Sequence, residues 1–435
     1  MKTKFAPLVA ALTLFAVTAC SSSDSDSSTQ QEEPTGPVAL TYWSWAPNMD
    51  KVVAAWNAKN PNIQVTVNKQ DGGDPAVTKL LTAIKAGSGA PDIMQAEYQK
   101  IPTLVSSDAI VDIAAEVGSV KDKFPEGAWS GVTLGSEAVY GVPQDSGPLM
   151  FFYRSDVFDK NGLQAPKTWD DYAAAAEKIH KANPKQYLGT FSSNDPGLFA
   201  GLAQQAGGSW WGVKGDAWSV NINEPNTQKV AAYWGGLVEK GVIDNKPMYT
   251  PEWNAALNDG TQVGWVSAVW APGVLEGSAK DTKGKWKAAT MPQWDVAAPA
   301  TGNWGGSATS VTTQSKYKKQ AAQFATWLNT DPEALKLLAG TANVYPAAND
   351  AASVLTSPPA FFSDQPDFYT IAGEAAKVTK PFTYGPNVNV AYNAFNDAFG
   401  KAAESKKATA FTEGLATMQQ TTVDDLKNTG FTVAG

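Results

Sequence analysis

The residues of this chain that could do chemistry are aromatic and acidic rather than nucleophilic or metal-binding. The 435 residues include 16 Trp but only one Cys, one His and one Arg, which is Arg154. One Cys and one His exclude an internal disulfide and a Cys- or His-rich metal site. Indole planes cover apolar surfaces, and carboxylates or amides bond hydroxyl groups. A single Arg suits an uncharged ligand better than a phosphate or a carboxylate.

Several Trp residues are candidates for contact with such a ligand. Trp210 and Trp211 lie in the Gly-rich segment 207–212, where a large aromatic side chain gains little burial, so we expect one of them to bind. Trp253 near a helix start and Trp270 after a strand are further candidates. Helical spacing instead predicts core positions for Trp56, Trp169, Trp234 and Trp327.

Length and charge narrow the class of protein. The length suggests two or three lobes with room for large cores. The formal charge is −8 and the pI is about 4.9. A nucleic-acid partner would need a basic face, so we expect none.

The N-terminus has the features of an export signal. Lys2 and Lys4 precede an apolar stretch, 5–17, of signal-peptide length. The ending Val-Thr-Ala-Cys20 resembles the bacterial lipobox, which predicts a lipoprotein signal peptide over 1–19 and lipid on Cys20. Residues 20–37 predict a solvated, flexible tether. We expect a protein anchored by lipid alone at the extracytoplasmic face of the cell membrane. The alternative is an ordinary signal peptide followed by a free Cys.

Strand and helix patterns alternate in the first part of the body. β-rich or alternating runs predict strands at 38–45, 63–67 and 91–94, and apolar stripes predict helices at 49–58 and 76–86. This alternation predicts an α/β fold with a parallel sheet built from βαβ units.

The remainder suggests that the chain visits a second lobe and returns. Two strands, 139–142 and 149–153, could cross between lobes, and Thr168 is the expected N-cap of a helix ending near 180. The middle section, about 166–292, is expected to be helical. Later strands are expected at 263–269 and 307–312, with helices at 318–328 and over most of 361–427. Two lobes joined by more than one strand can hinge and hold a ligand between them.

Ordered motifs carry a family resemblance. They are TYWSW from 41, PDIMQAE from 91, AVYGVPQDSGPLMFFYRSDVF from 138, TWDDY from 168, DGTQVGWVSAVW from 259 and TGNWGGSATSVT from 301. With the lipobox, this order resembles the extracellular solute-binding proteins of carbohydrate ABC transporters, the maltose-binding-like group. The resemblance implies a two-lobed periplasmic-binding-protein-like fold with a hinge and an inter-lobe ligand cleft. It places lobe 1 at 38–147 plus about 305–365, and lobe 2 at 148–304 plus about 366–435.

The same resemblance implies a function. Such a receptor, expected to be a monomer, captures a neutral disaccharide or short oligosaccharide and delivers it to membrane permease subunits, without enzymatic activity, cofactor or metal. A sugar ring has C–H-rich faces for indoles and a rim of hydroxyls for carboxylates. Cleft positions carried over from the family are Trp43, Trp45, Glu97, Tyr98, Gln144, Asp145, Trp270, Trp304, Gly305, Gly306 and Tyr345.

One departure from the family pattern, one choice between two Trp residues and two alternative functions remain open. Arg154 replaces the Asn common in the family, and we expect it to pair with Asp156 or Asp159. Trp43 and Trp45 point the same way if their strand continues, so one could bind while the other packs. A secreted glycoside hydrolase would need two carboxylates about 5–10 Å apart, and Glu97 with Asp145 could supply them. A surface lectin or adhesin would retain sugar without closing.

Overall fold

The computed structural model of the chain describes residues 36–342 and 344–434. The predicted signal peptide, Cys20 and most of the tether lie outside this part. Among the described residues, no helix has both the length and the apolar character needed to cross a bilayer. The strands are β1 (Val38–Ser44), β2 (Ile63–Lys69), β3 (Ile93–Glu97), β4 (Val142–Arg154), β5 (Trp211–Lys214), β6 (Ala217–Val220), β7 (Gly264–Ala268), β8 (Trp286–Thr290) and β9 (Asn303–Val311).

One central sheet runs through both halves of the body. Its order is β2-β1-β3-β9-β4-β7, with β8 also paired to β4. Strands β1, β2 and β3 are parallel, which confirms the predicted βαβ units, whereas β9 pairs antiparallel with both β3 and β4. The sheet is therefore mixed rather than wholly parallel, because β9 enters it on the return from the other half.

Strand β4 is the main crossing between the halves. Its first part, 142–148, pairs with β9, and its second part, 149–154, pairs with β7 and β8. The sequence predicts two separate strands here because Pro143, Gly147 and Pro148 interrupt the β pattern. In the structure these residues coincide with two shifts of register rather than with a break.

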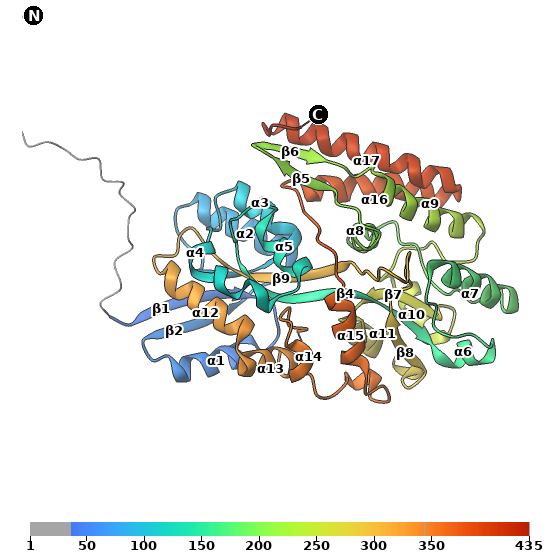
Figure 1. Cartoon of the computed structure of the whole chain (residues 1–435), viewed down its shortest axis with the longest axis horizontal. Coiled ribbons are helices and arrows are strands. Elements are labelled where there is room, and N and C mark those ends of the chain that lie inside the picture. The colour runs from blue at the N-terminus through green and yellow to red at the C-terminus, as the bar shows by residue number, and fades with distance from the viewer. Residues whose placement is uncertain (1–35, 343, 435) are drawn as a thin grey trace, which may run out of the picture. The chain divides into compact units, whose positions relative to one another are not determined.

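Helices cover the sheet and complete two lobes (Figure 1). The first lobe contains β1–β3 and the helices α1 (Met49–Lys59), α2 (Gly73–Lys85), α3 (Ile101–Ser106), α4 (Ala114–Val117), α5 (Glu126–Thr133), α12 (Lys318–Thr330), α13 (Pro332–Gly340) and α14 (Ala351–Val354). The second lobe contains β7 and β8 with α6 (Ser155–Lys160), α7 (Trp169–Ala182), α8 (Pro196–Gln205), α9 (Pro225–Glu239), α10 (Pro251–Asp259), α11 (Ala271–Ser278), α15 (Phe368–Lys377), α16 (Val388–Ser405) and α17 (Ala408–Asn428).

Helix packing suggests where the chain returns to the second lobe. The short 3-10 helix η4 (Ala360–Phe362) packs against α11, and α15 packs against β4 and β8. We therefore propose that the return lies between α14 and η4 rather than near 365.

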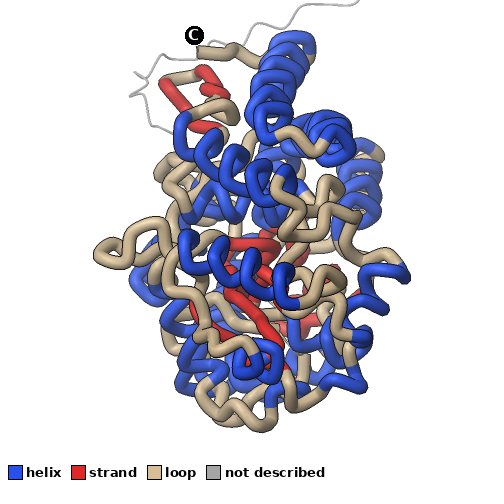
Figure 2. Tube along the Cα trace, turned by 90° about the vertical axis from the view of Figure 1, so that its right-hand side faces the viewer, coloured by secondary structure: helices blue, strands red, loops and turns tan. Residues whose placement is uncertain are grey.

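A small hairpin in the second lobe was not predicted. Strands β5 and β6 pair with each other apart from the central sheet, close to the C-terminal end (Figure 2). Gly215, at φ 59°, makes the tight turn between them, a conformation that favours glycine. Trp218 of β6 also forms a bridge with Val433. The middle section is thus less helical than expected.

Other local predictions are confirmed. The Thr168 side chain accepts from the Asp171 backbone N–H while the Asp171 carboxylate accepts from the Thr168 N–H, a capping box that starts α7. Arg154 is buried and forms two hydrogen bonds with Asp156, at 2.8 and 2.7 Å. Arg154 is thereby occupied within the second lobe.

Candidate functional site

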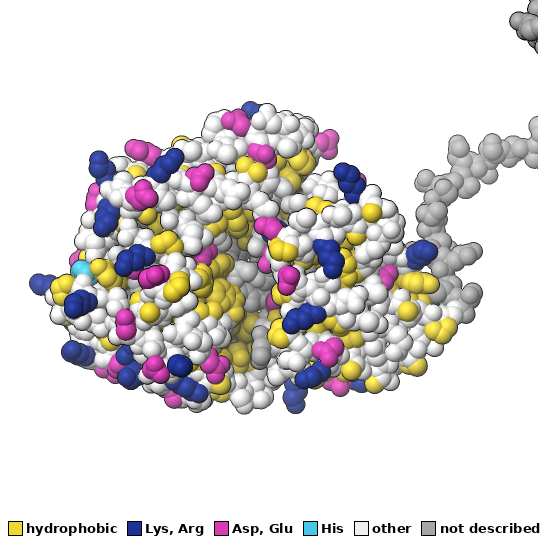
Figure 3. Space-filling model, turned by 180° about the vertical axis from the view of Figure 1, so that it is seen from behind, with side chains coloured by type: hydrophobic (Ala, Val, Ile, Leu, Met, Phe, Trp, Pro, Cys, Tyr) yellow, Lys and Arg dark blue, Asp and Glu magenta, His cyan; other side chains and the backbone are white. Residues whose placement is uncertain are grey.

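The lobes meet around a hollow beside the crossing strands. It has a volume of about 350 Å³ and is lined from the crossing strands, from α11, and from the segments that carry Tyr345 and Tyr369. Seen from behind, the surface is hollowed between the lobes, and hydrophobic side chains gather on the wall of the second lobe (Figure 3). Four predicted site residues line this hollow, namely Asp145, Trp270, Gly306 and Tyr345.

Asp145 and Gly306 form the floor, where β4 and β9 run side by side. The Asp145 carboxylate accepts from the Ser307 hydroxyl, and its backbone carbonyl accepts from the Tyr98 hydroxyl at 2.9 Å. Gly306 has φ 94°, and a Cβ there would lie 2.6 Å from Cε2 of Tyr98. Glycine is needed because the backbone is left-handed and the Tyr98 ring is in close contact. Burial raises the pKa of Asp145 to about 6, despite its bonds to Ser307.

Trp270 forms the aromatic wall of the hollow, and Trp304, which does not itself line the hollow, packs against it. Their rings lie 4.7 Å apart at 67°, an edge-to-face contact, and Nε1 of Trp270 donates to the Trp304 carbonyl at 3.0 Å. Trp270 lies two residues after the end of β7 and directly precedes α11, so the strand end and the helix fix its backbone. Although held in this way, Trp270 is 36% exposed. It therefore offers a rigid apolar plane at the hollow.

Tyr249 extends this wall and was missed from the sequence. It has φ 65° and is 41% exposed, and its ring lies near those of Trp253 and Trp304. On another side of the hollow, Tyr345 stacks with Tyr369, with centroids 6.3 Å apart. A positive φ is uncommon at a Tyr, and here it distinguishes Tyr249 in the structure. No sequence pattern predicts this backbone conformation, so Tyr249 could not be found from the sequence.

Glu97 lies at the carboxyl end of β3 and faces the second lobe. Burial raises the pKa of the Glu97 carboxyl, an effect opposed by the nearby Lys100. Glu97 in turn contributes to the raised pKa of Tyr384 and Tyr392, after burial. Trp45 follows β1 at the same edge of the sheet and is half-buried against Gly72.

Asp195 is a further acidic residue near the site, and the sequence analysis did not include it. Its Oδ1 accepts from the Leu198 backbone N–H at 3.0 Å and caps α8. Gly197, two residues on, lies against the Trp304 indole. Burial raises the pKa of Asp195 to about 7. The Asp-Pro sequence signals a helix start, but not that this helix begins beside the aromatic wall.

This raised pKa predicts a pH-dependent stability. A carboxyl whose folded-state pKa is raised does not lower the free energy of unfolding below about pH 4, where it is protonated in both states. Between pH 4 and 7 it lowers that free energy progressively, and above pH 7 the loss is constant. Asp195→Asn keeps an oxygen for the Leu198 N–H and removes the charge. We expect the stability of the variant, measured relative to the natural chain, to be greater at pH 8 than at pH 4 by on the order of 3 kcal/mol. Urea unfolding at both pH values checks this, and an equal difference at both would contradict it.

Four predicted binding Trp residues are instead packed inside the protein. Trp43 is 7% exposed with the Lys79 ammonium over its ring, and Trp253 is 2% exposed with Nε1 bonded to Thr190. The other two, Trp210 and Trp211, are 0% and 1% exposed. We therefore withdraw all four as stacking residues.

The error at 210–211 has a tertiary cause. Trp210 donates from Nε1 to Thr227, and its ring contacts Phe382. A Cβ on Gly385 would lie 2.2 Å from Trp211, so the chain between α15 and α16 packs directly on this indole. The Gly-rich segment is covered by residues more than 150 positions away, which local composition cannot reveal.

Gln144 and Tyr98 also have supporting rather than exposed positions. Gln144 is fully buried, and its Oε1 accepts from Tyr42 at 2.6 Å and Thr309 at 2.7 Å. Tyr98 is 3% exposed and holds Asp145, as described above. Gln144 lies at a shift of register between β4 and β9 and is buried, whereas Asp145 lines the hollow.

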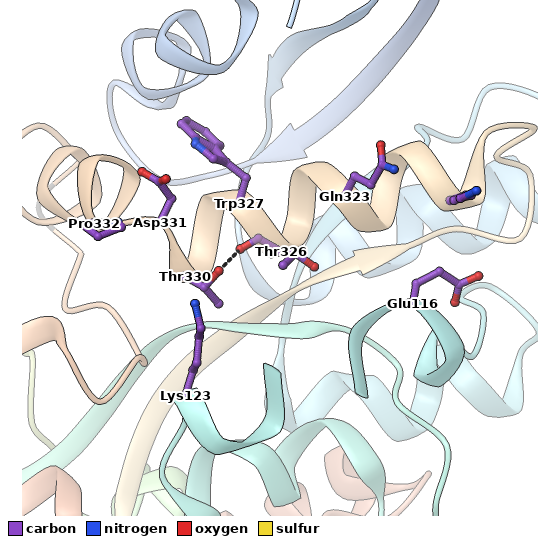
Figure 4. A pocket seen from close by; sticks show the side chains of 9 residues that line it. Glu116, Lys123, Gln323, Thr326, Trp327, Thr330, Asp331 and Pro332 are labelled. Carbon is purple, nitrogen blue, oxygen red and sulfur yellow. Dashed lines mark hydrogen bonds between the residues drawn. The ribbon is translucent and has the colours of Figure 1, made fainter. Parts of the chain in front are cut away.

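A second hollow lies away from the crossing strands. It has a volume of about 460 Å³, and α12 forms one side, with Lys123 and Glu116 beside it (Figure 4). Trp327 lines it and is half-buried, with its ring 5.4 Å from that of Trp56, so its predicted core position is only partly correct. The second hollow shares no lining residue with the first.

Two lobes connected by crossing strands, with an aromatic and acidic hollow between them, define a hinge-type binding protein. Residues 42–334 match the family model described as bacterial extracellular solute-binding protein. The chain belongs to this family, which confirms the resemblance seen in the sequence and the two-lobed fold.

Relatives in this family bind sugars according to their descriptions. The arabinooligosaccharide-binding protein of Bacillus subtilis (strain 168) is 26% identical over 317 residues, covering 70% of this chain and 72% of the relative. The lactose-binding protein of Rhizobium radiobacter is 28% identical over 310 residues, covering 66% and 69%. Among solved structures, the galacto-N-biose-/lacto-N-biose I-binding protein of the ABC transporter from Bifidobacterium longum, in complex with lacto-N-biose, is 30% identical with a TM-score of 0.78, covering 92% of this chain and 100% of that one.

Proposed function

We propose that this protein is the substrate-binding component of a carbohydrate ABC importer. It captures a neutral disaccharide or short oligosaccharide by hinge closure and delivers it to membrane permease subunits. It is not an enzyme, and lipid on Cys20 anchors it at the extracytoplasmic face of the membrane.

The observation that carries this proposal is that the Trp270 indole, which packs edge-to-face against Trp304, lines the same inter-lobe hollow as Asp145. An exposed indole face suits the C–H face of a sugar ring, and a carboxylate suits its hydroxyls. Because Trp270 is already held by its bond to Trp304, little side-chain entropy is lost when a ring stacks on it.

The charges around the site disfavour an anionic ligand and leave a neutral one unaffected. Glu97, Asp145 and Asp195 are all acidic. Lys100, the cation described near Glu97, is paired with Asp74, and Arg154 is paired with Asp156. An anionic sugar would be repelled by these carboxylates, and neither Lys100 nor Arg154 would be free to pair with it. The arabinooligosaccharide, lactose and lacto-N-biose named for the relatives are consistent with a neutral oligosaccharide, and malto-type and cello-type glucosides are further neutral candidates.

A thermal-shift screen over mono- and oligosaccharides tests the proposal. We expect at least one neutral di- or oligosaccharide to stabilise the protein, since ligand at 100 times its dissociation constant adds about 2.7 kcal/mol. Uronate-containing or phosphorylated analogues of that sugar should have little effect. A screen in which only charged ligands, or none, shift the unfolding temperature would contradict the proposal.

The same sugar separates the receptor from the two alternatives. Incubation should release no new reducing ends; turnover that Asp145→Asn abolishes would favour a glycoside hydrolase. In solution scattering the radius of gyration should fall when the sugar is added, because hinge closure makes the molecule more compact. An unchanged radius would favour a lectin that only retains the sugar.

A further inference from the structure

A paired lysine lies at the edge of the first lobe that faces the second. Lys100, in the 3-10 helix η1 (Tyr98–Lys100), has a side chain only 7% exposed. Its ammonium lies 2.6 Å from Oδ1 of Asp74 on α2, and this contact lowers the pKa of Asp74. Asp74 is 66% exposed, so the ion pair lies at the rim of the lobe.

One side chain of the second lobe bonds both members of this pair. Oδ1 of Asn389, on α16, accepts from the Lys100 ammonium at 2.5 Å, and its Nδ2 donates to Asp74 Oδ1 at 3.2 Å. The amide thus offers an acceptor to the cation and a donor to the anion. Hydrogen bonds to charged groups are stronger than those between neutral groups.

A neighbouring contact shows that this segment of the second lobe lies directly against the first. The Thr103 hydroxyl, on α3, donates to the Pro386 carbonyl at 2.9 Å. α16 packs on α8, α9 and α17 and so moves with the second lobe, whereas Lys100, Asp74 and Thr103 belong to the first. Separation of the lobes must break these bonds.

We propose that Asn389 with the Lys100–Asp74 pair forms a latch that stabilises the closed arrangement of the lobes. When the lobes separate, Asn389 leaves and the ion pair remains on the first lobe, so the latch favours closure without contributing a sugar contact. Lys100 also lies near Glu97, at the edge of the candidate site. The effect on sugar release rests on the proposed function; the effect on closure does not.

The test compares Asn389→Ala with Asn393→Ala. Asn393 is the same residue type one turn further along α16; it is also exposed and makes no contact with the first lobe among the hydrogen bonds described above. Closure is measured as the distance between nitroxides on Lys121→Cys and Lys401→Cys, in full chains carrying Cys20→Ser. In ligand-free protein, Asn389→Ala should shift the distance distribution toward longer, open values, and Asn393→Ala should not.

Sugar kinetics provide the second readout, with the best ligand of the screen. Asn389→Ala should raise the dissociation rate by about threefold to tenfold and leave the association rate unchanged, because truncating a polar contact acts mainly on dissociation. Distances and dissociation rates equal to those of Asn393→Ala would overturn the latch, as would a lower unfolding temperature with unchanged closure. If no sugar binds, the proposed function fails while the ligand-free distances still decide the latch.

Discussion

Trp270→Ala is expected to weaken sugar binding by about 2 kcal/mol or more, or roughly thirtyfold. Trp270 is the exposed member of the Trp270–Trp304 pair and is fixed by its bond to the Trp304 carbonyl. Removing the indole deletes both the apolar plane and the support for Trp304. Isothermal titration calorimetry with the ligand found in the screen measures the effect.

Trp294→Ala is the matched control for this prediction. Trp294 is also a half-buried Trp of the second lobe with ring contacts, to Trp169 and Tyr233, but it does not line the hollow. It should bind sugar as the natural chain does. Equal affinities for all three proteins would show that Trp270 is not the stacking residue.

Gly306→Ala is expected to destabilise the fold by about 3 kcal/mol and to remove sugar binding from the protein that still folds. The new Cβ would lie 2.6 Å from the Tyr98 ring and 3.0 Å from the Asp145 carbonyl, and φ is 94°. Tyr98 and Asp145 would both have to move, and they form the floor of the hollow. Urea unfolding and calorimetry measure the two effects.

Two control glycines separate backbone strain from steric overlap. Gly135 has φ 75°, but a Cβ added there would meet no atom within 4 Å, so Gly135→Ala should show strain alone, about 1 kcal/mol. Gly340, in a helix with open space, should tolerate Ala without loss. If Gly306→Ala costs no more than Gly135→Ala, the close packing of the floor on Tyr98 is not important for stability.

Much of the scaffold could be predicted from local patterns. The strands β1 to β3, the helices between them and the capping box of α7 all follow from periodicity and capping residues, which act over a few positions. The continuity of β4 could not be predicted, because whether Pro143 and Pro148 end a strand depends on the shifted register with β9. Strand β8 and the β5–β6 hairpin are short, so their alternation of apolar and polar residues is too brief to predict them.

The candidate site was predicted where the family motif fixed the position. Asp145, Trp270, Gly306 and Tyr345 come together at one hollow from segments 200 residues apart. Trp210 and Trp211 were misassigned because their coverage comes from the chain between α15 and α16. Asp195 and Tyr249 were missed because their nearness to Trp304 depends on how the loops of the second lobe fold.

A crystal structure of the protein with its tightest neutral oligosaccharide tests the central idea most directly. A sugar ring should lie over the Trp270 indole between the lobes, with a hydroxyl within hydrogen-bond distance of Asp145. A sugar bound instead in the hollow beside α12, or on one lobe without contact to Trp270 and Trp304, would contradict it.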